Sequence, residues 1–184
     1  MAQTIQKIAV IGAGAWGTAL ASVARRAGRD VVLHAHEVET ADAINTDHVN
    51  AVFLPDIPLD PAIRATTDLD DAVAEADALL MVTPAQFLRP TLAQIATARP
   101  PTAPIVICAK GIELDSGKLL NEVTEEVAPD ANLAVLSGPT FAAEVARGLP
   151  TAVTLACATP DTAERRPGDG RQLHAILKSA EVCG

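Results

Sequence analysis

The chain has 184 residues, of which 49% are hydrophobic and 2% aromatic, and its formal net charge is -9. This length can bury a complete core and form one domain, with room for the start of another, while the acidic charge and the lack of a basic stripe argue against a nucleic-acid partner. Because no apolar segment approaches membrane-spanning length and the N-terminus has no signal-peptide architecture, we expect a cytoplasmic protein without membrane insertion.

The first predicted element is a strand from Ile5 to Ile11, followed by a glycine-rich turn and then by a helix. The turn reads Gly12-Ala13-Gly14-Ala15-Trp16-Gly17. A strand, the spacing G-x-G-x-x-G and a helix, in this order, form the arrangement that binds the diphosphate of a dinucleotide. Gly12 would supply the tight turn, Gly14 a close approach of the phosphates, and Gly17 close packing of the helix on its strand. The free N–H groups at the helix start would face the negative charge.

The same turn carries two residues that we expect to line the bound diphosphate with their backbone. These are Ala15 and Trp16, of which Trp16 is also suited to anchor the core, and the two roles are compatible. The alternative is a purely structural glycine turn that binds no ligand, because short glycine spacings arise by chance.

Strand-like apolar runs alternate with helical segments through most of the chain. After the first strand, the predicted strands are Val31–Leu33, Ala78–Val82, Ile105–Ala109, Leu133–Leu136 and Thr151–Ala156. The predicted helices are Ala15–Gly28, Val38–Ile44, a segment with Asp68 as its N-cap, Phe87–Thr97, Leu119–Val127 and Phe141–Arg147. Asn50 to Pro61 holds three prolines and is predicted to be a loop. The alternation predicts an α/β fold: a Rossmann-like, doubly wound, mostly parallel sheet with helices on both faces.

Ligands of parallel sheets collect at the carboxyl ends of the strands, so the residues there are the candidates for chemistry. His34-Ala35-His36-Glu37 follows the second predicted strand. An acid at this place binds a ribose 2′-hydroxyl, whereas a positive group favours a 2′-phosphate. Because His36 and Glu37 are both present, NAD and NADP remain alternatives as the cofactor. For His34 the simplest interpretation is a surface histidine without a ligand.

Two more strand ends carry candidate groups. Lys110, with Gly111 to turn the chain, follows a buried strand, where a cation could attract a substrate anion or hydrogen-bond a reacting oxygen. The alternative is a solvent-exposed lysine without a role in binding. Ser137-Gly138-Pro139-Thr140-Phe141 follows the next strand, and there Pro139 suits a first helical position with Gly138 as the cap before it. Such a helix start would offer a second site for an anion or an amide, unless the turn is purely structural.

Other kinds of site find no support in the sequence. Cys108, Cys157 and Cys183 are far apart and form no C-x-x-C pair, so we expect neither a disulfide framework nor a zinc site. No Ser-His-Asp order, H-E-x-x-H motif, Walker glycine–lysine pattern or cluster of metal ligands occurs, and we therefore expect no metal.

Taken together, several segments resemble bacterial NAD(P)-dependent glycerol-3-phosphate dehydrogenase, from the N-terminus to about Cys157. The segments are Ile11–Ala21, Asn50–Pro55, Lys110–Glu113 with Gly117–Leu120, Ser137–Ala142 and Gly148–Ala152. Many dehydrogenases share the glycine turn, whereas the F-L-P, K-G and S-G-P-T-F-A segments together are much more specific.

The resemblance implies an enzyme that interconverts dihydroxyacetone phosphate and sn-glycerol 3-phosphate and feeds glycerophospholipid synthesis. It implies a small-molecule substrate, NAD or NADP as the cofactor, and a homodimer as an allowed assembly. The implied cofactor-binding residues are Gly12, Gly14, Ala15, Trp16, Gly17, His36, Lys110 and Ala142. The implied substrate-binding residues are Lys110, Gly138 and Thr140.

The last part of the chain departs from the family. We assign residues 1–160 to the dinucleotide-binding domain and residues 161–184 to a divergent tail without resemblance, and we expect the family's helical second domain to be absent. The resemblance places the proton-accepting lysine in that second domain, and Lys178 sits in no similar context. We therefore expect a chain that binds dinucleotide but lacks groups for turnover, as a truncated or frame-shifted gene product would.

Two other functions remain open from the sequence alone. A different dehydrogenase, acting on a sugar acid or a 2-keto acid, would share the glycine turn and would not respond to dihydroxyacetone phosphate. A non-catalytic dinucleotide-binding fragment would bind the cofactor without any turnover. Binding titrations followed by turnover assays distinguish these functions from the predicted dehydrogenase.

Overall fold

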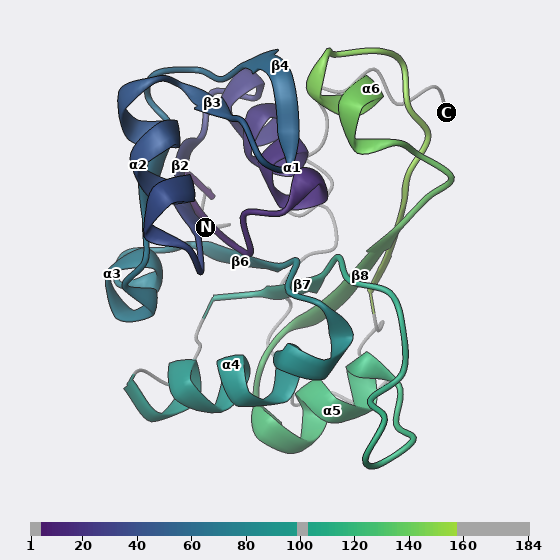
Figure 1. Ribbon diagram of the computed structural model, residues 1–184. Helices are drawn as coiled ribbons and strands as arrows, with labels where there is room; N and C mark the ends of the chain where they lie inside the picture. The colour runs from purple at the N-terminus through teal and green to yellow at the C-terminus, as the bar shows by residue number, and fades with distance from the viewer. Residues whose placement is uncertain (1–4, 99–102, 158–184) are drawn as a thin grey trace.

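The computed structural model describes residues 5–98 and 103–157, which form a seven-stranded sheet, a separate two-stranded hairpin and the helices around them (Figure 1). The strands are β1 (Lys7–Ile11), β2 (Asp30–His34), β3 (Val49–Asn50), β4 (Leu54–Pro58), β5 (Arg64–Thr66), β6 (Ala78–Met81), β7 (Ile105–Ile107), β8 (Leu133–Ser137) and β9 (Thr154–Cys157). The helices are α1 (Ala15–Arg26), α2 (Val38–Thr46), α3 (Leu69–Val73), α4 (Ala85–Ala98), α5 (Leu120–Val127) and α6 (Ala142–Ala146). Every predicted strand and helix is present, with ends that differ by a few residues.

The order of the large sheet is β5-β2-β1-β6-β7-β8-β9. Neighbouring strands pair in parallel from β5 to β8, and the edge strand β9 runs antiparallel to β8. The chain builds outward from β1 in one direction and then returns to continue from β6 in the other, so the strand order reverses between β1 and β6. Ligands of doubly wound sheets bind at the carboxyl ends of the strands beside such a reversal. The predicted Rossmann-like, mostly parallel sheet is confirmed.

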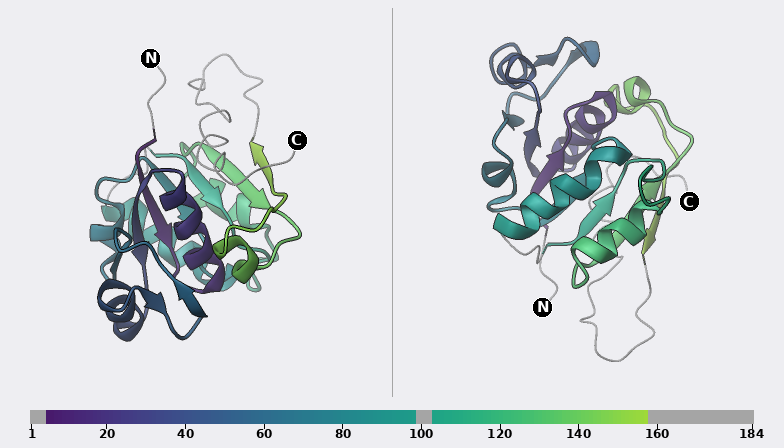
Figure 2. Two further views of the ribbon diagram at one scale, coloured as in Figure 1. Left: turned by 90° about the horizontal axis from the view of Figure 1, so that it is seen from above. Right: turned by 60° about the horizontal axis from the view of Figure 1, so that its bottom comes forward.

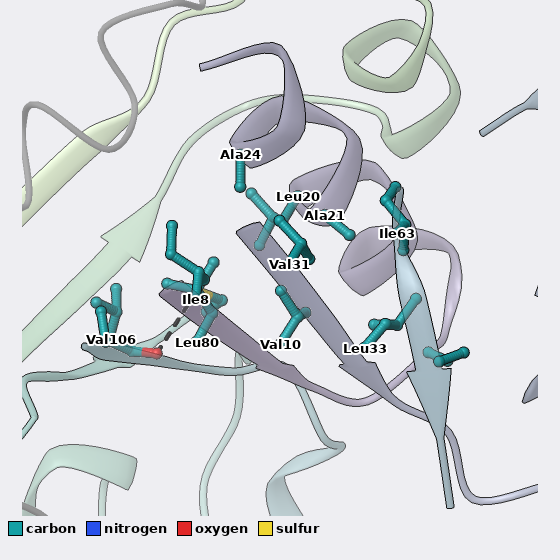
Figure 3. Packing of buried hydrophobic residues seen from close by; sticks show 14 of the residues in the cluster. Ile8, Val10, Leu20, Ala21, Ala24, Val31, Leu33, Ile63, Leu80 and Val106 are labelled. Carbon is teal, nitrogen blue, oxygen red and sulfur yellow. Dashed lines mark hydrogen bonds between the residues drawn. The ribbon is translucent and has the colours of Figure 1, made fainter. Parts of the chain in front are cut away.

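Helices cover both faces of the sheet because the central strands are apolar on both faces. In β1, Ile8 and Val10 lie on one face and Ala9 and Ile11 on the other, and all four are buried. The first face packs against α1 and α2, as Figure 3 shows for α1. The second face packs against α3, α4 and α5, and the right-hand view of Figure 2 shows α4 and α5 lying across it.

The short helix α6 packs on the side of α1 that faces away from the sheet. Ala19 and Val23 of α1 share a buried cluster with Val145 and Ala146 of α6. The guanidinium of Arg26 donates hydrogen bonds to the carbonyl oxygens of Val145 at 2.7 Å and Ala146 at 2.9 Å. These bonds satisfy carbonyls at the end of α6, and they tie this late segment to the first helix of the fold.

The segment from Asn50 to Pro61 was predicted to be a loop, and this prediction is wrong because the segment contains most of a β-hairpin. Strands β3 and β4 pair antiparallel, with Val49 opposite Pro58 and Asn50 opposite Leu54 and an irregular register between the pairs. A hairpin leaves one side of each strand unpaired, so a proline without an N–H is tolerated there. The three-residue strand β5 was also not predicted, because it is too short to show a period.

The start of α3 follows the prediction. Asp68 is its N-cap, and the carboxylate accepts hydrogen bonds from the backbone N–H groups of Asp70 at 2.9 Å and Asp71 at 3.2 Å. Two of the donors that a helix start leaves unpaired are thereby satisfied.

Candidate functional site

The glycine turn after β1 is so tightly packed that two of its glycines admit no side chain. Gly12 has a φ of +117°, and its N–H donates to the carbonyl oxygen of His34 at 3.0 Å. A Cβ on Gly12 would lie 3.1 Å from the backbone N of Thr83. A Cβ on Gly17 would lie 1.8 Å from the carbonyl oxygen of Gly12. The turn and the close packing of α1 on it therefore both require glycine.

Gly14, in contrast, faces open space. It is exposed, a Cβ at this position would meet no atom within 4 Å, and its extended backbone forms the N-cap of α1. Ala15 and Trp16 follow as the first residues of the helix, where N–H groups have no intrahelical acceptor. A negatively charged group can thus approach this backbone without a steric obstacle.

A cavity of about 360 Å³ lies beside the turn, at the carboxyl ends of β6, β7 and β8. Its lining consists of Trp16, Val82, Thr83, Pro84, Cys108, Ala109, Lys110, Leu136, Ser137, Gly138, Thr140 and Ala142. Segments far apart in the sequence therefore meet here, and they bring predicted site residues together. The predicted residues in this lining are Trp16, Lys110, Gly138, Thr140 and Ala142. Trp16 also packs against the buried core, so it both lines the cavity and anchors the fold.

Lys110 is exposed and lies three residues after the end of β7, beyond the buried Cys108. Its Nζ atom lies 3.4 Å from the carbonyl oxygen of Gly138, to which it donates a hydrogen bond. A side chain of α4 fastens the loop that follows. Gln86 donates to the carbonyl oxygen of Ile112 at 2.9 Å and accepts from the N–H of Leu114 at 2.9 Å. The backbone next to the lysine is thus tied to a helix.

A network of ion pairs fastens the same loop further along. The buried carboxylate of Glu113 accepts hydrogen bonds from Nε and Nη2 of Arg89 at 2.8 and 2.9 Å, and the Ser116 hydroxyl donates to it as well. Arg89 also pairs with Glu126 of α5 at 2.8 Å. The guanidinium of Arg89, followed by the Ser116 hydroxyl, lowers the pKa of Glu113 from its ordinary value near 4.5 to about 2. Glu113 is therefore ionised at neutral pH and holds the loop onto α4.

The sequence predicted that Gly138 caps a helix, and this prediction is wrong. Helix α6 begins only at Ala142, with Phe141 as its N-cap, so Pro139 is not the first helical residue. A Cβ on Gly138 would lie 2.7 Å from the carbonyl oxygen of Ala152, because the chain passes back along the end of β8 before it enters β9. The close approach of two backbone segments is the reason for a glycine here.

The end of β2 lies outside the lining of the cavity. His34 is half-buried rather than a surface residue, and burial lowers the pKa of its imidazole. His36 and Glu37 are both exposed and directly precede α2. The structure therefore does not bring His36 to Lys110, but leaves it accessible beyond the glycine turn.

The end of β6 also lines the cavity, although no prediction singled it out. Thr83 and Pro84 follow this strand, which is the neighbour of β1 at the reversal of strand order. The Oγ1 atom of Thr83 is buried and has no hydrogen-bond partner among the residues that the structure describes. Buried hydroxyl groups usually have one. Its place directly after a buried strand was the signal available in the sequence.

Residues 5–98 and 103–157 contain no group of three or more His, Cys, Asp or Glu side chains that could hold a metal ion. Cys108 and Cys157 are free thiols, and burial raises the pKa of Cys108 so that it stays protonated. Cys183 lies outside the described residues. Among the helices described, none has the length and apolar character needed to cross a membrane.

Comparison with known proteins points to one family. The profile described as NAD-dependent glycerol-3-phosphate dehydrogenase N-terminus matches residues 7–163. The curated glycerol-3-phosphate dehydrogenase (NAD(P)+) of Parvibaculum lavamentivorans is 60% identical over 164 residues, which are 89% of this chain and 49% of that protein. The protein of the same name from Paramagnetospirillum magneticum is 58% identical over 176 residues, which are 96% of this chain and 61% of that protein.

Solved structures agree with this result. The glycerol-3-phosphate dehydrogenase of Coxiella burnetii superposes with a TM-score of 0.78 at 34% identity, over 84% of this chain and 47% of that one. The enzyme of Saccharomyces cerevisiae gives a TM-score of 0.79 at 29% identity, over 95% of this chain and 54% of that one. The chain thus spans about half the length of the relatives it matches. Since the family profile covers most of its residues, the chain belongs to the NAD-dependent glycerol-3-phosphate dehydrogenase family, whose N-terminal region it matches.

Proposed function

We propose that this chain is the dinucleotide-binding part of an sn-glycerol-3-phosphate dehydrogenase. The reaction converts dihydroxyacetone phosphate and NAD(P)H into sn-glycerol 3-phosphate and NAD(P)+, and its product would serve glycerophospholipid synthesis. The observation that carries the proposal is the position of Lys110, whose ammonium lies in the lining of a cavity next to the glycine turn. A cation at the carboxyl ends of the strands suits a phosphorylated substrate.

The proposed binding residues come from the glycine turn and from the ends of the strands that surround it. For the cofactor they are Gly12, Gly14, Ala15, Trp16, Gly17, His36, Lys110 and Ala142. For the substrate they are Lys110, Gly138 and Thr140. Lys110 belongs to both sets because its side chain bridges from the end of β7 to the end of β8.

NAD(P)H, when bound, supplies the hydride that reduces the carbonyl carbon of the substrate. As the carbon accepts the hydride, negative charge builds up on the carbonyl oxygen. The Lys110 ammonium would stabilise this charge, because a preorganised cation at the edge of a cavity needs little reorganisation. A proton must then reach the oxygen to complete the alcohol. In the family that the sequence resembles, a lysine of the second, helical domain carries out this proton transfer.

We further propose that turnover requires that second domain. Residues 1–160 would form the dinucleotide-binding domain and residues 161–184 a divergent tail, which lies outside the described residues. The 184-residue chain is then expected to bind NADH or NADPH without oxidising it when dihydroxyacetone phosphate is added.

Fluorescence titration with NADH and NADPH tests the cofactor site, and the variant Lys110→Met tests the residue. Loss of a charge-assisted hydrogen bond is expected to weaken NADH binding by roughly 10- to 100-fold. The matched control is Lys118→Met, on the same loop, because this lysine pairs with Glu126 instead of lining the cavity. Equal affinities of the Lys110→Met variant and the unaltered chain would contradict the assignment.

A turnover assay tests the need for the second domain. We expect no oxidation of NADH by the chain with dihydroxyacetone phosphate, and measurable oxidation after the second half of the Parvibaculum lavamentivorans relative is added or fused. Oxidation by the chain alone, at a rate comparable to the fusion, would show that the required groups already lie within it.

We also propose a cytoplasmic location and a homodimer. Free thiols at Cys108 and Cys157 suit a reducing compartment. Exposed apolar side chains, among them Phe87, Leu114 and Phe141, offer surface that a second copy could cover. Sedimentation equilibrium over a range of concentrations tests the dimer, and a monomer at every concentration would reject it.

A further inference from the structure

We propose that Asn50 is a positioning residue of the dinucleotide site, which sets the orientation of the peptide group between Ala13 and Gly14 for the bound diphosphate. The inference rests on the proposed cofactor binding and goes beyond it. It gives a function to the hairpin of β3 and β4, which belongs neither to the large sheet nor to the lining of the cavity.

The side chain of Asn50 links the hairpin to the glycine turn. Asn50 is 0% exposed, and its Nδ2 donates to the carbonyl oxygen of Ala13 at 2.8 Å and to Oγ1 of Thr18 at 2.8 Å. Its Oδ1 accepts from the N–H of Phe53 at 3.1 Å, within the hairpin. Thr18 is itself fully buried, and its hydroxyl donates to Ala13 at 3.4 Å. Both N–H groups and the oxygen of the buried amide are therefore engaged, as the cost of burying it requires.

These bonds decide which way the next N–H points. In a trans peptide the carbonyl and the N–H lie on opposite sides, and the described chain has no cis peptide bond. With the Ala13 carbonyl directed inward to Asn50, the N–H of Gly14 points outward. Gly14 is exposed, a Cβ there would meet nothing within 4 Å, and no acceptor among the described residues takes its N–H. A free donor at the start of α1, facing open space, is what a diphosphate oxygen can accept from.

Asparagine suits this role because one planar group offers two donors. In the variant Asn50→Asp the shape is kept, but a carboxylate oxygen would face the carbonyl oxygen of Ala13 and could not donate to it. The peptide between Ala13 and Gly14 would lose its buried partner and turn more freely. We expect the dissociation constant for NADH to rise about tenfold or more, since the donor would no longer be held in place before binding.

The chain supplies a matched control in Asn45, near the end of α2. Its Nδ2 donates to the carbonyl oxygen of Ala65 at 2.9 Å, and its Oδ1 accepts from the N–H of the same residue at 2.8 Å. Asn45→Asp therefore removes a comparable amide donor to a backbone carbonyl, but on β5 rather than on the glycine turn. We expect this variant to lower the unfolding temperature and to leave the NADH affinity of the folded chain within a factor of two or so.

Two measurements separate positioning from general damage to the fold. Titration with ADP-ribose and with adenosine compares a ligand that has the diphosphate with one that lacks it. In Asn50→Asp we expect the affinity for ADP-ribose to fall by about the same factor as that for NADH, and the affinity for adenosine to stay unchanged. In the ligand-free chain, the NMR order parameter of the Gly14 amide should drop in Asn50→Asp and not in Asn45→Asp.

Unchanged NADH affinity in Asn50→Asp, or equal losses for ADP-ribose and adenosine, would overturn the inference. If Asn50→Asp does not fold, Thr18→Val takes its place, because it removes the hydroxyl that joins Asn50 and Ala13, and a weaker loss of the same pattern is expected. If the unaltered chain binds neither NADH nor NADPH, the proposed function fails, while the Gly14 order parameter still decides whether Asn50 holds this peptide.

Discussion

At the level of single residues, the glycine turn combines two opposite surroundings within four positions. A Cβ on Gly17 would lie 1.8 Å from the carbonyl oxygen of Gly12, whereas a Cβ on Gly14 would meet no atom within 4 Å. Gly17 is therefore needed by the fold itself. Gly14 has room for a side chain in the ligand-free chain, so its lack of one would matter only for the proposed approach of phosphates.

Alanine variants of the two glycines should separate stability from binding. Gly17→Ala is expected to lower the free energy of unfolding by about 1–3 kcal/mol, as overpacking usually does, and to impair NADH binding because α1 must shift. Gly14→Ala should leave the unfolding free energy within about 0.5 kcal/mol but weaken NADH binding. Urea unfolding and fluorescence titration measure the two quantities. A Gly14→Ala chain with unaltered NADH affinity would speak against a diphosphate at this place.

At the level of elements, the loop between β7 and α5 depends on one ion-pair centre. Arg89 binds Glu113 through two hydrogen bonds, and Gln86 binds the backbone on both sides of this carboxylate. Because Lys110 lies at the start of the same loop, the charge on Glu113 also affects the position of Lys110. Loss of that charge would loosen the segment that carries the cation of the cavity.

The contribution of the Arg89–Glu113 ion pair to stability should depend on pH in the acid range. The lowered pKa of Glu113 means that its ionised form stabilises the folded chain above a pH near 4.5, and that this contribution is lost as the pH falls through about 2. Glu113→Gln is expected to melt a few degrees lower at pH 7 and to lose less stability than the unaltered chain between those two pH values. Thermal melting at several pH values measures both effects. Glu125→Gln, at an exposed position of α5, is the control and should follow the unaltered chain.

The sequence predicted most elements because their signals are local. Apolar runs such as Leu79 to Met81 and the carboxylate cap at Asp68 depend on neighbouring residues, and both predictions are confirmed. The hairpin of β3 and β4 was not predicted, because its prolines suggest a loop and its pairing depends on contacts with the rest of the fold. For the same reason the buried amide of Asn50 could not be read from the residues around it.

The candidate site divides in a similar way. The glycine turn and the strand end at Lys110 follow from motif and strand pattern, so the sequence could indicate them. The neighbouring residues suggest that Gly138 caps a helix. A glycine is needed there for another reason, the close carbonyl oxygen of Ala152, which belongs to a backbone segment fourteen positions later. The orphaned hydroxyl of Thr83 becomes visible only when its surroundings are known.

For the whole molecule, a ligand that binds the folded chain should raise its thermal stability. At an NADH concentration of 100 times the dissociation constant, linkage gives about 2.7 kcal/mol, which corresponds to roughly 5–10 °C in melting temperature for a domain of this size. Differential scanning fluorimetry measures the shift, with nicotinamide alone as the control ligand. The absence of any shift at millimolar NADH would count against dinucleotide binding by the folded chain.

The antiparallel edge strand determines where the polypeptide leaves the Rossmann layer. Strand β8 runs toward the cavity, and β9 runs back, so that Thr154 pairs with Ser137 and Cys157 with Ala134. Cys157, the last residue that the structure describes, therefore lies beside the amino end of β8, away from the cavity. A group that reaches the proposed site from beyond Cys157 would therefore have to span at least the length of β9, about 13 Å. A fluorescent protein fused after this strand would consequently report on ligand binding at the proposed dinucleotide site without covering the cavity.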